Sequence, residues 1–250
     1  MLAETSQLPM QLSYDAGMAR RRYGRSRWRR WIFRFAIAIG VVLVLSLALV
    51  LPLRWLQPTT TAFMLLDDSG RKPPLHEWID WGRLGSAAAL AVVAAEDQKF
   101  ADHFGFDVGS IRDSIADAED GGRLRGASTI SQQTVKNLYL WPGRNFLRKG
   151  LEAWLTVVAE ICLPKRRILE IYLNVAEFGP GIYGVGAASD YYFGRPPSRL
   201  TDAQAALLAA VLPNPRRLHA DQPSRYVRER QRWILVQMRR LRRESWLSRL

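Results

Sequence analysis

A long uncharged segment follows a cluster of arginines and limits what the first part of this 250-residue chain can be. Phe35 to Leu51 is 17 residues without a charge, and apolar residues before Arg34 lengthen the run. About 20 apolar residues span a bilayer, and an arginine near the end of the run can reach the headgroups. The pattern predicts a transmembrane helix over 31–53. The length of the run and the lack of a small-x-small cleavage site disfavour a signal peptide.

The formal net charge of +13 has a strong contribution from the N-terminal segment, where eight arginines lie between Arg20 and Arg34. Because positive residues stay on the cytoplasmic side of a membrane, we expect residues 1–30 in the cytoplasm. The chain from about residue 55 onward is then expected outside the inner membrane. The arginine block is interpreted as a topology signal and a contact for anionic lipids. A nucleic-acid-binding arm is the alternative.

The remaining sequence predicts a largely helical domain after a connector over 54–75. The single cysteine, Cys162, excludes an intrachain disulfide, and three widely spaced histidines do not suggest a structural zinc site. Few stretches alternate with period two, which disfavours strands. Helical patterns cover residues 86–104, 108–119, 128–140, 146–162, 165–178, 186–193, 201–212 and 223–248.

Gly179, Gly181 and Gly184 spell the G-x-G-x-x-G pattern of dinucleotide-binding loops. That fingerprint needs a strand before it and a helix after it. Here the preceding residues follow a helical pattern, and Pro180 fills the second position. The sequence therefore predicts a tight turn between two packed helices and no nucleotide site.

A polar stripe marks the segment GASTISQQTVKN. Thr129, Gln132, Gln133 and Lys136 have the i, i+3, i+4, i+7 spacing of one helix face. Amide and hydroxyl groups beside one lysine suit a sugar and a phosphate, whereas an ordinary solvated face more often carries Glu–Lys pairs. An exposed helix face is the alternative interpretation. Ser128 or Thr129 is also expected to cap the start of this helix.

The segment AAEDQKFADHFGFD places an acid at the end of an apolar, alanine-rich stretch. If the helix continues, Glu96, Phe100 and His103 lie on one face at i, i+4 and i+7. A solvated helix end is one interpretation of this pattern. One wall of a proton-transferring site is the other.

A second acid, Glu152, follows the cluster of Arg144, Arg148 and Lys149. Arginine and lysine side chains in such a group can bind a pyrophosphate. Glu152 has cationic neighbours and Glu96 has apolar ones, and such contrasting surroundings favour divided acid and base roles. Each glutamate alone could also be an ordinary helix residue.

Four blocks in this order resemble the family 51 peptidoglycan glycosyltransferases: EDQKFADHFGFD, GASTISQQTVKN, RKGLEAW and RRILEIYLNVAEFGPGIYG. The likeness covers roughly residues 60–215, and the single span and short length resemble the monofunctional biosynthetic members. It implies a mainly α, lysozyme-like glycosyltransferase domain over 76–220, with a small membrane-proximal jaw that includes 107–127. The C-terminal residues 221–250 form a basic amphipathic helix beyond the likeness, expected to lie on a membrane or, second, to dock a partner.

The resemblance also implies the chemistry and the roles of individual residues. Glu96 would be the general base that deprotonates the 4-hydroxyl of lipid II, which attacks the lipid-pyrophosphate-linked glycan chain with inversion. Glu152, the second catalytic residue, would organise the donor pyrophosphate. Asp97, Phe100 and His103 would support the base and shape the site. The donor-binding positions would be Ser128, Thr129, Gln132, Gln133, Lys136, Asn137, Arg144 and Arg148.

The same resemblance suggests cofactors, partners and location. A Mg²⁺ or Mn²⁺ ion, held by Glu152 through the pyrophosphate, is the candidate cofactor. The expected partners are lipid II, the lipid-linked glycan chain, membrane lipids and division or elongation proteins, with no nucleic acid. The expected location is the bacterial inner membrane, with a cytoplasmic N-terminus and a periplasmic catalytic domain. A glycan hydrolase, an inactive membrane scaffold and a tethered nucleic-acid binder are the alternatives.

Overall fold

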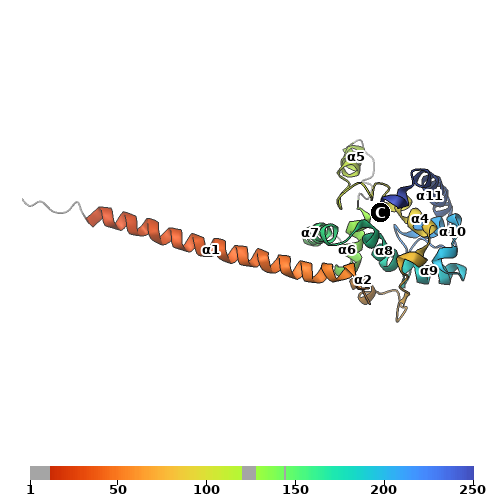
Figure 1. Ribbon diagram of the computed structural model, residues 1–250, viewed down its shortest axis with the longest axis horizontal. Helices are drawn as coiled ribbons and strands as arrows, with labels where there is room; N and C mark the ends of the chain where they lie inside the picture. Colours follow the sequence, from red (N-terminus) through yellow and green to blue (C-terminus); the bar gives the residue numbers. More distant parts are fainter. Residues whose placement is uncertain (1–11, 120–127, 144) are drawn as a thin grey trace, which may run out of the picture. The chain divides into compact units, whose positions relative to one another are not determined.

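The computed structural model describes residues 12–119, 128–143 and 145–250 (Figure 1). Part of the predicted jaw segment and Arg144 therefore lie outside the described residues. The chain divides into two units, one ending at Ala48 and the other running from Leu49 to Leu250.

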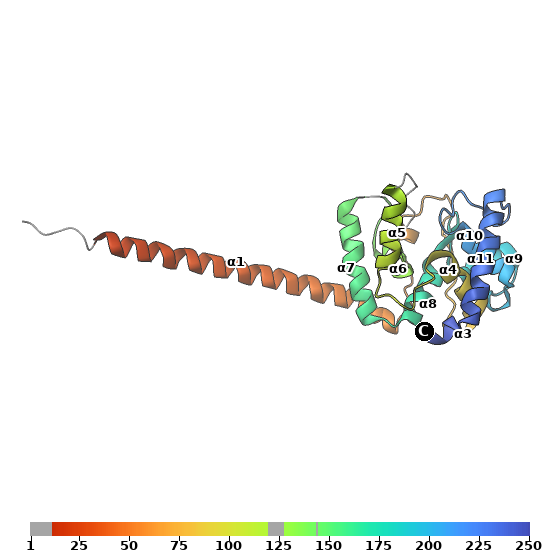
Figure 2. The same cartoon turned by 90° about the horizontal axis from the view of Figure 1, so that it is seen from above.

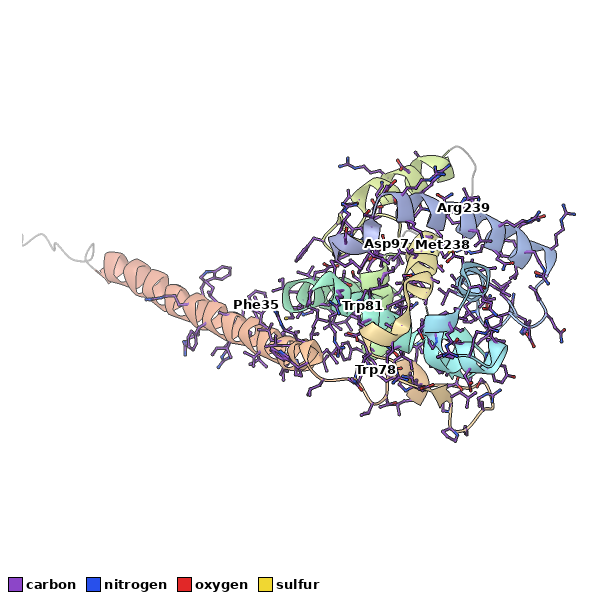
Figure 3. All side chains as sticks on the ribbon, turned by 45° about the vertical axis from the view of Figure 1, so that its right-hand side comes forward. Phe35, Trp78, Trp81, Asp97, Met238 and Arg239 are labelled. Carbon is purple, nitrogen blue, oxygen red and sulfur yellow. The ribbon has the colours of Figure 1, made fainter. Side chains whose placement is uncertain are left out.

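The first helix, α1 (Leu12–Val50), leads into a 3-10 helix, η1 (Leu51–Arg54). Within the described residues, Trp28–Arg54 is the one stretch long and apolar enough to cross a membrane, with 27 residues. At about 1.5 Å per residue it exceeds the roughly 30 Å of a hydrocarbon core. Phe35 on this helix is 69% exposed, as an aromatic facing lipid would be (Figure 3). A helix that could cross a membrane is thus present over the predicted residues.

The second unit consists of short helices and one small sheet (Figure 2). Five of the eight predicted helices have both ends within two residues of the prediction, and those predicted over 86–104, 165–178 and 223–248 end earlier than expected. The elements are α2 (Ala62–Leu65), β1 (Leu75–His76), α3 (Trp81–Leu84), α4 (Ser86–Glu96), α5 (Val108–Glu119), α6 (Ile130–Tyr139), α7 (Phe146–Cys162), α8 (Lys165–Val175), β2 (Glu177–Gly179), β3 (Ile182–Tyr183), α9 (Gly184–Phe193), η2 (Pro197–Arg199), α10 (Asp202–Val211), α11 (Arg225–Arg243) and η3 (Trp246–Arg249).

The glycine-rich turn between α8 and α9 is a small hairpin. β2 pairs antiparallel with β3, and β1 adds a parallel strand on the other side of β3. Gly184 has a φ of +82°, and a Cβ there would lie 2.6 Å from the carbonyl oxygen of Asn174. Only glycine allows this approach of α9 to the end of α8. The expected turn is present, but the two- and three-residue strands were missed because they are too short to show alternation.

Helix α4 is at the centre of the domain core. Seven consecutive residues, 88–94, are buried on all sides of the helix. Helices α8, α10 and α11 pack against it (Figures 1 and 2). Because four of the seven side chains are alanine, these neighbours can approach closely without loss of packing density. The rigid, buried α4 therefore gives a fixed position to whatever side chain stands at its end.

The prediction that this helix continues to residue 104 is wrong, because α4 ends at Glu96. Asp97 leaves the helical conformation with φ −162° and ψ 78°, and its carboxylate binds groups on other segments. Phe100 is fully buried, with its ring centroid 6.3 Å from that of Trp246 and 6.2 Å from that of His103. Phe100 therefore belongs to the core beside His103, and its role in supporting the base and shaping the site stays a prediction.

The C-terminal helix α11 is part of the same core. Its apolar residues Val227, Ile234, Met238 and Leu241 are buried, and α11 packs against α4 and α10. Met238 is directed inward, whereas Arg239 is exposed (Figure 3). The interpretation of this stretch as a helix lying on the membrane is wrong, because its apolar face is already covered by the domain.

Candidate active site

Glu96 is the last residue of α4, and its carboxylate has a partner on each oxygen. Gln133 of α6 donates its side-chain amide to Oε2 at 2.9 Å. Arg230 of α11 approaches Oε1 at 3.3 Å and also donates to the carbonyl oxygen of Ala95 at 3.2 Å. The Glu96 side chain remains 12% exposed. It is thus held from two sides yet open to a small approaching group.

Asp97, the next residue, holds the surrounding chain in place. Its carboxylate lies 2.9 and 3.0 Å from Nε2 of His103. It also accepts a hydrogen bond of 3.0 Å from the backbone N–H of Ile130, the first residue of α6. That N–H has no partner inside the helix, and a carboxylate at a helix N-terminus is electrostatically favourable. Asp97, held by His103, therefore fixes the start of α6 beside Glu96.

Thr129 and Gln132 form a capping box at the start of α6. The Thr129 hydroxyl accepts from the N–H of Gln132, and Gln132 Oε1 accepts from the N–H of Thr129. Thr129 is thus the N-cap, one of the two predicted candidates. Gln132 and Asn137 are 4% and 7% exposed. Gln132 stabilises the helix end through this capping box, and its role in binding the donor stays a prediction.

The second acid, Glu152, lies in a buried ion pair on α7. Arg148 donates to its Oε2 at 2.7 Å, and Lys149 contacts its Oε1. The side chains of Glu152 and Arg148 are 3% and 9% exposed, whereas that of Lys149 is 47% exposed. Lys149 also lies 3.4 Å from the hydroxyl of Ser128. The predicted cationic cluster around Glu152 is therefore present for these two residues.

Lys136 of α6 connects the two acids electrostatically. Burial lowers the pKa of its ammonium, and the negative charges of Glu152 and Glu96 act in the opposite direction. Its Nζ lies 5.6 Å from the ring centroid of Phe63 in the connector. A half-buried cation that both carboxylates influence, with no salt bridge of its own among the described residues, is suited to stabilise an incoming negative charge.

Two cavities meet at Glu96. The larger, about 850 Å³, includes Gln133 and Lys136 on one side and Tyr226, Arg230 and Trp233 on the other. The smaller, about 290 Å³, extends toward Asp97, Lys99 and Asp107. The residues common to both are Ala95, Glu96, Ser128 and Trp233. Two molecules that bind one in each cavity would therefore meet beside the Glu96 carboxylate.

The sequence did not indicate three contributors to this site: Arg230, Trp233 and Tyr172. Arg230 and Trp233 come from α11, more than 130 residues after Glu96, and no local pattern pairs them with it. Tyr172 is buried in α8 and donates to Gln133 Oε1 at 3.1 Å. In the sequence, Tyr172 fits the apolar pattern of its helix and is therefore interpreted as an ordinary core residue.

Replacing Glu152 by glutamine should destabilise the protein by about 3 kcal/mol, since it leaves the buried Arg148 charge unpaired. The loss of the Lys149 ion pair adds less to this destabilisation, because water can replace the Glu152 carboxylate at the exposed Lys149 side chain. The matched control is Glu229→Gln, which removes an exposed i,i+4 pair with Arg225 and should change stability by less than about 1 kcal/mol. Urea unfolding of both variants in detergent measures the difference. Equal, small effects would show that the Glu152 pair contributes no more than a surface pair.

Comparison with known proteins identifies the family of the chain. The family model described as Transglycosylase matches residues 65–239, which includes both acids and most of α11. The chain is 49% identical over 228 residues to the biosynthetic peptidoglycan transglycosylase of Stutzerimonas stutzeri strain A1501, covering 89% of this chain and 94% of the relative. It is 50% identical over 208 residues to that of Ectopseudomonas mendocina strain ymp, covering 81% and 86%. It is 58% identical over 172 residues to the biosynthetic peptidoglycan transglycosylase of Klebsiella oxytoca, covering 68% of this chain and 71% of the relative.

The match confirms the family expected from the four sequence blocks and extends it beyond residue 215 into the C-terminal helix. The share of the relatives that is covered is high enough for the comparison to apply to the whole domain. The chain belongs to the transglycosylase family of peptidoglycan glycosyltransferases.

Proposed function

We propose that this protein polymerises lipid II into peptidoglycan glycan strands. The observation that carries the proposal is the position of Glu96 at the junction of two cavities, the larger of which is also lined by Lys136, a cation that Glu96 and Glu152 both influence. The donor, a glycan chain linked to undecaprenyl pyrophosphate, would bind on the Lys136 side. Lipid II would bind as acceptor on the other side of Glu96.

The reaction requires one proton transfer and one displacement. Glu96 takes the proton of the lipid II 4-hydroxyl while that oxygen forms a bond to the anomeric carbon of the donor. The bond from the anomeric carbon to the pyrophosphate breaks on the opposite face, so the configuration inverts. Lys136, with Arg148 and Lys149 nearby, stabilises the charge of the leaving undecaprenyl pyrophosphate. The transfer is thus complete without a covalent enzyme intermediate.

A divalent cation fits the free protein poorly. Both oxygens of Glu152 already contact cationic side chains, and the described residues contain no group of three or more His, Cys, Asp or Glu side chains suited to a metal. A Mg²⁺ or Mn²⁺ ion would therefore have to bind together with the substrate pyrophosphate. Polymerisation measured with added Mg²⁺, added Mn²⁺ or EDTA tests this. Equal rates in all three would remove the ion from the scheme.

The linkage in the product tests the proposed reaction. Purified full-length protein in detergent, given labelled α-linked lipid II, should form strands whose new bonds are β and are cut by a β-specific muramidase. Release of undecaprenyl pyrophosphate should accompany each bond. Strands with retained configuration would contradict direct displacement, and a failure to form strands from lipid II would contradict the function itself.

Membrane attachment is supported by the span Trp28–Arg54 and by the surface next to its end. Within the second unit, Arg167 donates to the carbonyl oxygen of Leu53 at 2.7 Å, and Arg54 donates to that of Cys162 at 3.3 Å. Helix α7, which ends at Cys162, exposes the apolar side chains of Phe146, Leu147, Leu151, Trp154, Val157 and Ile161. An exposed apolar face that begins where the chain leaves the span is suited to contact the lipid surface. Such a position would bring the site to the level of lipid-linked substrates.

The topology proposal places the N-terminus in the cytoplasm and the second unit in the periplasm. A membrane-impermeant maleimide should label Gln222→Cys, an exposed position, in intact spheroplasts. It should label Ser6→Cys only after permeabilisation. The native Cys162 is buried and serves as the unlabelled background. The reverse labelling pattern would contradict the orientation inferred from the arginine block.

A further inference from the structure

A buried hydrogen-bonded chain reaches Glu96 from outside the cavities. It starts at Tyr172 of α8, whose side chain is buried and whose hydroxyl donates to Oε1 of Gln133 at 3.1 Å. The other end of the Gln133 amide donates to Oε2 of Glu96 at 2.9 Å. Three packed helices, α8, α6 and α4, therefore contribute one link each. Tyr172 does not line either cavity at Glu96.

The Tyr172 end determines which group donates and which accepts in each of these hydrogen bonds. Burial and the negative charges of Glu96 and Asp97 raise the pKa of Tyr172 well above its usual value, so the phenol keeps its proton. A buried O–H needs an acceptor, and Gln133 Oε1 provides it. The amide then has its N–H₂ group on the Glu96 side. A reversed amide would place its oxygen against the carboxylate, which is electrostatically unfavourable.

The charged groups around Glu96 explain why this orientation matters. Arg230 lies 3.3 Å from Oε1, Lys136 acts on Glu96 from α6, and Asp97 adjoins it in the chain. If Gln133 did not hold Oε2, the carboxylate could rotate into a closed ion pair with Arg230. Both oxygens would then be occupied by the guanidinium, and the base would be turned away from the acceptor. Gln133 and Arg230 thus balance each other across the carboxylate.

We propose that Tyr172 is a positioning residue for the base: it fixes the side-chain amide of Gln133, which holds the Glu96 carboxylate toward the acceptor hydroxyl. The inference rests on the proposed function, in which Glu96 deprotonates lipid II. It also changes the role of Gln133. This residue was predicted to bind substrate, but both ends of its amide are used to orient the base.

Tyr172→Phe should lower kcat about tenfold through the loss of one oriented hydrogen bond, with KM for lipid II changed less than about twofold. Gln133→Ala should lower kcat at least as much, again with little change in KM. In the Gln133→Ala background, Tyr172→Phe should have no further effect on kcat, because its only route to Glu96 is gone. Tyr192→Phe removes a half-buried phenol of α9 that donates to the carbonyl oxygen of Phe178 in β2, and it should leave kcat unchanged.

A Tyr172→Phe effect of equal size in both backgrounds would overturn the inference, since Tyr172 would then act through general packing. So would a parent-like kcat in Tyr172→Phe. If that variant fails to fold by circular dichroism, Gln133→Ala decides alone: a raised KM with normal kcat would mark Gln133 as a substrate contact and reject the positioning role. These outcomes test only the positioning role. The role of Glu96 as the base is tested separately by Glu96→Gln, and full activity of that variant would reject it.

Discussion

Replacing Glu96 by glutamine should lower the rate of lipid II polymerisation by about 10²- to 10⁴-fold, the usual contribution of a general base. The amide has almost the same shape as the carboxylate but cannot take the proton of the 4-hydroxyl. The surroundings strengthen the effect. Gln133 and Arg230 both present donors to residue 96, so one of them would face the new amide N–H₂ group.

Two further variants make the Glu96 experiment specific. Glu96→Asp keeps a base but withdraws it by one methylene, and its rate should lie between those of the parent and of Glu96→Gln. Glu244→Gln, which changes an exposed acid after α11, should have parental activity. Each variant should keep the parental unfolding midpoint within a few degrees. A Glu96→Gln enzyme within tenfold of the parent would contradict the assignment of the base.

Replacing Lys136 by methionine should lower turnover by about 10²- to 10³-fold, comparable to removing one preorganised donor from an oxyanion site. Lys136 is the half-buried cation that both acids influence, and methionine keeps the length and apolar stem of the side chain. Lys149→Met is the graded comparison. Its side chain is 47% exposed, so water can take its place and the loss should be less than about tenfold.

The pH dependence gives a second readout for Lys136. The ammonium is the active form, so the rate is full below its pKa and is lost as the pH rises through it. Because burial lowers this pKa from 10.5, the alkaline decline of the parent should begin at a lower pH than for an ordinary lysine. Lys136→Met should lack that decline. Equal rates for the methionine variant and the parent would show that the leaving pyrophosphate is stabilised elsewhere.

The sequence predicted most helices because each has an apolar side that repeats with helical period. It failed where a side chain binds something distant in the chain. The end of α4 is the clearest case: Asp97 leaves the helix to bind the N–H of Ile130 and the ring of His103, and neither partner is visible in the local pattern. Phe100 was misplaced for the same reason, since its position was extrapolated from an uninterrupted helix.

In the candidate site, too, the sequence indicated residues with a local signal and missed those brought in by distant segments. Glu96, Glu152, Lys136 and Gln133 could be selected from their residue types and from the resemblance. The contribution of α11 could not, because its arginines looked alike. Arg230 approaches Glu96, whereas Arg228 and Arg232 on the same helix are exposed, and only the packing of Val227 and Ile234 against α4 decides which one turns inward.

The most direct test of the central claim is to give the purified full-length protein labelled lipid II together with preformed glycan strands and to follow both. We expect lipid II to be consumed, strands to lengthen, and one undecaprenyl pyrophosphate to be released for each new bond. Shortening of the preformed strands while lipid II remains unused would contradict the account and identify the protein as a glycan hydrolase.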